Sequence, residues 1–141
     1  MYSKLLKLIL LTASLGWGIS IFFVLLPWSV TTAVLNGLGA GTIPSDPMLN
    51  YWMRMAGGGF TMIGAIFAAI LFNPRKYAVL LPLMACLSIA EGIILLVSGL
   101  SLGLSPLPFW GDSSFCLAVG IGILLVYPRA KKEQERNSGQ P

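Results

Sequence analysis

The sequence predicts an all-α integral membrane protein, an antiparallel four-helix bundle with both termini in the cytoplasm. Of its 141 residues, 56% are hydrophobic and 10% are charged, whereas soluble domains carry about 25% charged residues. A chain of this composition cannot cover a water-facing surface. Four apolar runs have, or nearly have, the length of about 20 residues that a membrane-spanning helix needs. The predicted helices are about 5–26, 47–72, 77–99 and 109–127.

The basic residues predict the orientation of these helices. Apart from Arg54, they form three groups: Lys4 and Lys7, Arg75 and Lys76, and Arg129, Lys131, Lys132 and Arg136. The two longer connections, 27–50 and 100–108, contain one charge outside the predicted helices, Asp46. Because Lys and Arg accumulate in cytoplasmic loops, both termini and the turn after the second helix are expected in the cytoplasm, with the longer connections outside.

The first apolar run, 5–26, is expected to be a retained helix. A signal peptide could start similarly, but its apolar region spans only about 7–15 residues, and this run continues through Trp17 to Leu26. It ends at Pro27. The outer loop, 27–46, includes a mildly apolar stretch, 29–38, that could lie along the membrane interface as a short helix.

Proline and its neighbours define the remaining helix ends. Asp46 is expected to cap the second helix, with Pro47 at its first position. That helix should end before Pro74, because a residue that precedes proline disfavours helical geometry. Pro82 is expected to kink the third helix, and Ser105-Pro106 to open the fourth.

Pro128 is expected to close the fourth helix. The chain therefore divides into one transmembrane domain, 1–130, and a polar cytoplasmic tail, 131–141. Helix packing should use glycine, because small residues let helices approach closely in lipid. The candidate contact glycines are Gly16 and Gly18 in the first helix, Gly57, Gly58, Gly59 and Gly64 in the second, and Gly120 and Gly122 in the fourth.

Glu91 is the residue that bears most directly on function, because it lies inside an apolar run. An isolated charge there costs roughly 3 kcal/mol on insertion scales. At 1.5 Å per residue, Glu91 is about 20 Å from Tyr77 and about 12 Å from Gly99, which assigns it to the outer half of the membrane. Arg54 and Asp112 lie near the outer ends of their helices.

The sequence therefore predicts an Arg54–Glu91 ion pair, since a guanidinium fork suits a carboxylate. Asp112 is expected as a second acidic neighbour nearer the surface. A ligand pocket at this pair would have a rim of Asn50, Tyr51, Trp52 and Trp110. The connection 27–50 would cover it.

Several interpretations of this group stay open. The pair could simply hold two helices together, or line an outward-facing pocket for a lipid or small amphipathic molecule. Glu91 could instead titrate in a proton-coupled transporter that acts as an oligomer. Arg54 could also extend to the interface and leave Glu91 without a charged partner. The leading hypothesis is a non-enzymatic protein whose Arg54/Glu91 pocket binds a small amphiphile or a membrane partner; a structural accessory subunit is the remaining alternative.

Several functions are not favoured. The chain has no histidine, which excludes Ser–His, Cys–His and histidine–metal chemistry within it. Cys86 and Cys116 are expected to be small packing residues. Neither a cofactor nor a metal site is predicted, and no residue is marked as catalytic. The C-terminal basic cluster could bind nucleic acid or a phosphoinositide-type lipid, but Glu133 and Glu135 dilute it, so a topology signal on a solvated tail is favoured and nucleic acid is not an expected partner.

The motifs PSDPMLNYWMRMAGGGF, NPRKY and FWGDSSF, with four predicted spans and an acidic residue in the third, resemble the BphX-like family of small bacterial four-helix membrane proteins. The resemblance covers nearly the whole chain. It implies a location in the bacterial inner (plasma) membrane. That family has no established activity, so the resemblance implies no catalytic residues and lends support only to a hydrophobic ligand.

Overall fold

The computed structural model describes residues 2–74, 76–104 and 106–138, without the side chains of residues 107, 108, 134, 135, 137 and 138. Its helices are α1 (Tyr2–Gly18), α2 (Ile21–Leu25), α3 (Trp28–Gly37), α4 (Pro47–Phe72), α5 (Leu80–Ser101) and α6 (Pro106–Ser138). These ranges contain no strand, so the all-α class is confirmed. Arg75 and Ser105, which carried predictions for a turn and a helix start, lie outside the described residues.

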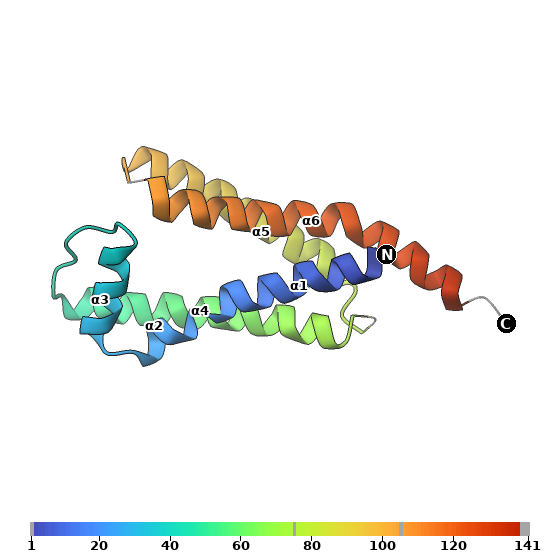
Figure 1. Ribbon diagram of the computed structural model, residues 1–141, viewed down its shortest axis with the longest axis horizontal. Coiled ribbons are helices and arrows are strands. Elements are labelled where there is room, and N and C mark those ends of the chain that lie inside the picture. Colours follow the sequence, from blue (N-terminus) through green and yellow to red (C-terminus); the bar gives the residue numbers. More distant parts are fainter. Residues whose placement is uncertain (1, 75, 105, 139–141) are drawn as a thin grey trace.

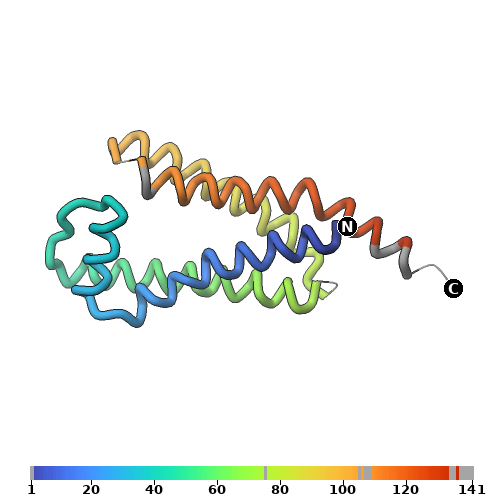
Figure 2. Tube along the Cα trace, viewed as in Figure 1, coloured from blue at the N-terminus to red at the C-terminus, as the bar shows by residue number. Residues whose placement is uncertain are grey.

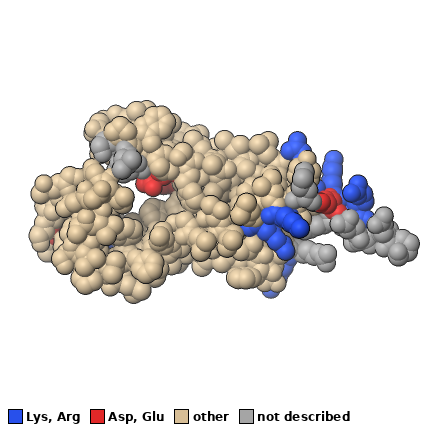
Figure 3. All heavy atoms as spheres, viewed as in Figure 1, with Lys and Arg blue, Asp and Glu red and all other residues tan. Residues whose placement is uncertain are grey.

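Four stretches of the described chain are long and apolar enough to cross a membrane: Tyr2–Leu25, Pro47–Phe72, Leu80–Ser101 and Phe109–Glu133. Large apolar side chains cover their outer faces; Phe72, for example, is 78% exposed. Such faces suit contact with lipid, as expected of a multi-pass membrane protein. Figure 3 shows Lys and Arg gathered at the end of the molecule where both termini lie.

The long helices contact one another in the order α4–α1–α6–α5. Helix α1 lies between α4 and α6, whereas α4 and α5 are not a closely packed pair. Along α4, Gly64 faces Gly18 and Gly57 faces Val24, so α4 runs opposite to the first span. We call the four helices from α1 to α4 the first arm, and the pair α5 and α6 the second arm. The two arms diverge toward the end that bears α3 (Figures 1 and 2).

Helices α1 and α4 cross at a contact that only glycine permits. A β-carbon on Gly64 would lie 2.6 Å from the Gly18 nitrogen and 2.8 Å from its Cα. The Ser14 hydroxyl donates a hydrogen bond to the Gly64 carbonyl at 3.1 Å. The glycines therefore serve as helix contacts at this crossing, in agreement with the prediction for Gly18 and Gly64.

The first membrane span is interrupted just after this crossing. Helix α1 ends at Gly18 and the chain resumes as α2 at Ile21, so the single helix predicted over 5–26 is wrong there. Glycine weakens a helix because it loses the most conformational freedom on folding, and two glycines precede the break. After the break, α2 packs against α4.

The predicted ends of α4 are confirmed. The Asp46 carboxylate accepts hydrogen bonds from the Met48 N–H at 2.7 Å and the Leu49 N–H at 3.3 Å, with Pro47 at the first helical position. The helix ends at Phe72, before Asn73 and Pro74. Helix α3 occupies the part of the 27–46 connection in which a short helix is expected.

Pro82 does not act as predicted. It is the third residue of α5, and the first four N–H groups of a helix have no partner within that helix. Its missing donor is therefore no loss, and it belongs to the start of the helix, not to a kink in its middle.

The prediction that Pro128 closes the last helix is also wrong, because α6 continues through it to Ser138. The segment expected as a polar tail is thus helical as far as Ser138. Contacts with the start of α1 support this extension. The Ser3 N–H donates to Glu133 Oε2 at 2.9 Å, and Ala130 is buried. A pattern based on proline alone could not include these long-range contacts.

Gly64→Ala should lower the free energy of unfolding by about 1–3 kcal/mol, the usual cost of forcing extra atoms into a packed contact. Gly58→Ala is the matched control, because nothing lies within 4 Å of a β-carbon there. The control should be neutral or stabilise by about 0.5–1 kcal/mol. Unfolding in detergent micelles measures both, and equal stability of the two variants would contradict the crossing.

Candidate functional site

Arg54 is held by the first arm alone. Its Nε donates to Asn50 Oδ1 at 2.9 Å, and its Nη2 donates to the Leu26 carbonyl at 3.2 Å. Its Nη1 donates to the Val24 carbonyl. These carbonyls lie at the end of α2, where the last C=O groups of a helix lack partners and a cation is favourable. Arg54 thus fastens the end of α2 to α4.

The predicted Arg54–Glu91 ion pair is not formed in the described part of the chain. The register of the helices explains why. Gly92, next to Glu91, packs against Ser113 and Leu117 of α6. Farther along the same row of helices, Phe115 packs against Gly16 of α1.

Gly16 in turn lies between the two α1 residues that meet Gly64 of α4. The level of Glu91 therefore corresponds to the level of Gly64. Arg54 is ten residues nearer the start of α4, or roughly 15 Å at 1.5 Å per residue. The prediction from chain position alone, which puts the two residues at one level, is wrong.

Glu91 is half-buried on α5. Its carboxylate has no hydrogen bond or ion pair among the residues that the structure describes. Both Glu91 and Asp112 are near enough to the buried Cys116 side chain to interact with it electrostatically. Glu91 lies on α5 and Asp112 on α6, so both carboxylates belong to the second arm, whereas Arg54 is bound within the first arm.

A cavity of about 330 Å³ lies between the two arms, and we call it the central cavity. The first arm contributes Phe23, Leu35, Met53 and Phe60 to its wall, and the second arm contributes Leu95 and Phe115. Polar lining comes from Ser20 and Asp112. Figure 3 shows a hollow between the arms with acidic atoms at its edge. The volume is within the range of small-molecule sites, about 300–1,000 Å³.

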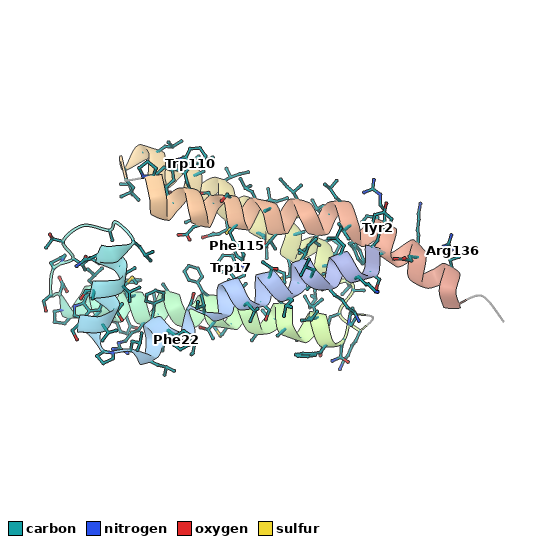
Figure 4. All side chains as sticks on the ribbon, in the orientation of Figure 1. Tyr2, Trp17, Phe22, Trp110, Phe115 and Arg136 are labelled. Atoms are coloured by element: carbon teal, nitrogen blue, oxygen red, sulfur yellow. The ribbon has the colours of Figure 1, made fainter. Side chains whose placement is uncertain are left out.

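Trp17 forms the inner wall where the arms meet. Its ring centroid is 5.2 Å from that of Phe60 and 5.9 Å from that of Phe115. Figure 4 shows Trp17 and Phe115 directed toward each other from α1 and α6. The side chain of Trp17 is 8% exposed, and its Nε1–H has no hydrogen-bond partner among the described residues. A buried donor without a partner costs free energy.

Asp112 contributes a hydrogen-bond acceptor to the cavity, in contrast to the Trp17 indole, which is a donor. It lies in the second turn of α6, lines the central cavity and is also exposed at the protein surface. The cavity is therefore open on this side. A carboxylate accepts hydrogen bonds or attracts a positive group, whereas the Trp17 indole only donates. A molecule with both an acceptor and a donor group would satisfy both side chains.

The predicted rim residues do not surround this cavity. Tyr51, Trp52 and Trp110 are exposed on the outside of the arms, as is typical of aromatic residues at a membrane interface. Asn50 is occupied by Arg54. Of the seven predicted site residues, only Asp112 lines the central cavity. The aromatic residues near the starts of α4 and α6 are therefore typical of a membrane interface and do not line the cavity.

Trp17, Ser20 and Phe115 are among the lining residues that the sequence did not predict as part of a site. Trp17 lies between Gly16 and Gly18. A large ring carrying a polar N–H between two contact glycines is a signal that could have suggested a crossing with a cavity beside it. No group of three or more metal-ligating acidic, cysteine or histidine side chains occurs among the described residues.

Comparison of the chain with protein-family models, curated proteins and solved structures finds no match. The resemblance to the BphX-like family therefore stays a prediction from its motifs.

Arg54→Gln should lower the free energy of unfolding by about 1.5–3 kcal/mol, because it removes charged donors from carbonyls that would stay partly buried. Glu91→Gln should leave it nearly unchanged, because Glu91 has no described ion pair to lose. Thermal unfolding in detergent compares the two. Recovery of stability in an Arg54→Glu, Glu91→Arg double variant would instead indicate a direct pair and contradict this arrangement.

Proposed function

We propose that this chain is a non-enzymatic, multi-pass protein of the bacterial inner (plasma) membrane that binds a small amphiphile in its central cavity. Both termini are cytoplasmic in this proposal. The support is the placement of basic residues: every described Lys and Arg except Arg54 lies in the helix ends or the turn at the end that carries the termini. Positive residues are retained on the cytoplasmic side.

The observation that carries the binding proposal is a cavity lined on one side by Trp17, whose buried Nε1–H has no hydrogen-bond partner among the described residues, and on the other side by Asp112. Ligand sites are typically apolar cavities with a few polar groups that fix orientation. The central cavity has this composition. Its ligand would place an apolar body among Phe23, Phe60 and Phe115, a hydrogen-bond acceptor near Trp17, and a donor or positive group near Asp112.

The membrane surrounds the opening of such a site. The arms diverge toward the end bearing α3, and apolar side chains cover the outer faces of both. A ligand could therefore enter from the lipid without passing through water. This favours a molecule that partitions into the membrane, a lipid or small amphiphile, over a fully polar solute.

One alternative function has its own supporting observation. Glu91 and Asp112 are two carboxylates on the arm that does not contain Arg54, and Glu91 has no ion pair in the described chain. A proton-coupled transporter that works as an oligomer could use either group as its titrating site. Glu91→Gln would then abolish pH-dependent flux while ligand binding persists. A structural accessory subunit would bind no small molecule in any variant.

The binding proposal predicts that native mass spectrometry of the protein, extracted from its own membrane, detects a bound small amphiphile. Trp17→Phe keeps a ring between Phe60 and Phe115 and removes the N–H. It should raise the dissociation constant of the ligand about fivefold to tenfold, as expected for one hydrogen bond worth about 1–1.5 kcal/mol.

Trp52→Phe is the matched control, because Trp52 is exposed and does not line the cavity. It should retain the ligand at the wild-type level. A wild-type protein that carries no additional mass, or equal loss from both variants, would contradict the proposal.

A further inference from the structure

A second pocket lies at the opposite end of the molecule, beside the two termini. It has a volume of about 290 Å³ and is lined by Tyr2, Arg129, Lys132, Glu133 and Arg136. We call it the basic pocket. It shares no lining residue with the central cavity, so a ligand in the basic pocket does not depend on a ligand in the central cavity; it rests on the proposed membrane orientation alone.

The three basic side chains share one face of α6. Arg129, Lys132 and Arg136 are spaced at i, i+3 and i+7, and residues at this spacing lie above one another on a helix. They do so only because α6 remains helical beyond Pro128. Figure 4 shows Tyr2 and Arg136 toward the same end of the molecule.

Contacts with α1 fix the base of the basic pocket. The Arg129 guanidinium lies 5.8 Å from the centre of the Tyr2 ring, and its Nη1 donates to the Leu125 carbonyl at 2.9 Å. The Ser3 N–H donates to Glu133 Oε2, so one carboxylate oxygen is directed at α1. The pocket is therefore built from two helices, and among its described lining side chains the basic ones outnumber the acidic one.

The depth of the basic pocket matches the headgroup layer of a bilayer. Arg129 is twenty residues after Phe109, where the last candidate span begins, and twenty residues of helix measure about 30 Å. That length equals the hydrocarbon thickness of a bilayer, about 30 Å. Lys132 and Arg136 then lie roughly 5–10 Å farther out, at the level of lipid phosphates.

We propose that the basic pocket binds a phosphate group, and that its source is the headgroup of an anionic phospholipid. A guanidinium presents paired donors that fit phosphate oxygens, and an ammonium adds a compact charge. Basic pockets at the cytoplasmic ends of membrane helices bind acidic headgroups for this reason. Lys132 and Arg136 are exposed, with Arg136 also near the Glu133 carboxylate, whereas Arg129 and Tyr2 form the base.

The test uses the full chain in detergent, with phosphatidylglycerol or phosphatidylcholine added and the retained lipid measured by native mass spectrometry. The wild type should retain phosphatidylglycerol in preference. The Lys132→Gln, Arg136→Gln double variant should lose on the order of 20-fold in affinity, roughly fivefold for each basic side chain near an anionic group. Neither side chain has a described hydrogen bond that folding needs.

The Lys4→Gln, Lys7→Gln double variant is the control. It removes the same charge at the same end, from exposed side chains that do not line the basic pocket. It should retain phosphatidylglycerol within about a factor of two of the wild type if binding is local, since exposed charges farther away are screened. Equal loss from both double variants, or no preference for phosphatidylglycerol in the wild type, would overturn the lipid assignment.

Competition with inorganic phosphate tests whether the bound phosphate group belongs to a lipid headgroup or to a soluble ligand. Phosphatidylglycerol that stays bound when millimolar phosphate is added supports the headgroup. A different result would be that no lipid is retained, but inorganic phosphate raises the melting temperature of the wild type and the control and not that of the Lys132→Gln, Arg136→Gln variant. That result would support the phosphate site and assign it to a soluble ligand. Absence of both effects would overturn the site.

Discussion

Helix α1 is held on both sides by contacts with no room for an additional side chain, and the rest of the structure depends on them. On one side, the backbone at Gly18 meets Gly64 of α4; on the other, Gly16 meets the Phe115 ring of α6. Close approach of this kind is what associates helices in lipid, where burial of apolar surface contributes little. Beyond these contacts the span breaks and α2 runs along α4. The second arm is then left apart, and the central cavity occupies the space between.

The same helix contacts separate the charged residues Arg54, Glu91 and Asp112 between the two arms. Arg54 satisfies the carbonyls of Val24 and Leu26, which would otherwise lack donors in an apolar environment. Glu91 and Asp112 belong to the second arm. A guanidinium that donates to backbone carbonyls needs no carboxylate partner, so Arg54 is satisfied within the first arm. The central cavity therefore has an acidic group on one wall and the indole ring of Trp17 on the other.

The sequence predicted most helices of the fold well and the pairing of the charged side chains poorly, for different physical reasons. Asp46, Pro47 and Pro74 act through their immediate neighbours, so the ends of α4 could be predicted. Pro128 failed as a helix end because the extension of α6 depends on Ser3 and Glu133, which are 130 residues apart. The Arg54–Glu91 pair failed because the depth of a residue depends on how each helix is shifted against its neighbour. That the Trp17 indole has no hydrogen-bond partner in the described chain could not be predicted, because it depends on how Phe60 and Phe115 pack against it.

The central claim is that the Trp17 indole N–H lies in the wall of a site that a ligand fills. The most direct measurement is the NMR spectrum of protein labelled with ¹⁵N at the indole nitrogens of its four tryptophans, recorded as extracted from the membrane and again after complete removal of bound lipid and small molecules. We expect the Trp17 resonance to shift between the two samples while those of the exposed Trp52 and Trp110 do not. A Trp17 resonance that is unchanged on removal, or that exchanges as fast as those of the exposed tryptophans in both samples, would contradict this claim.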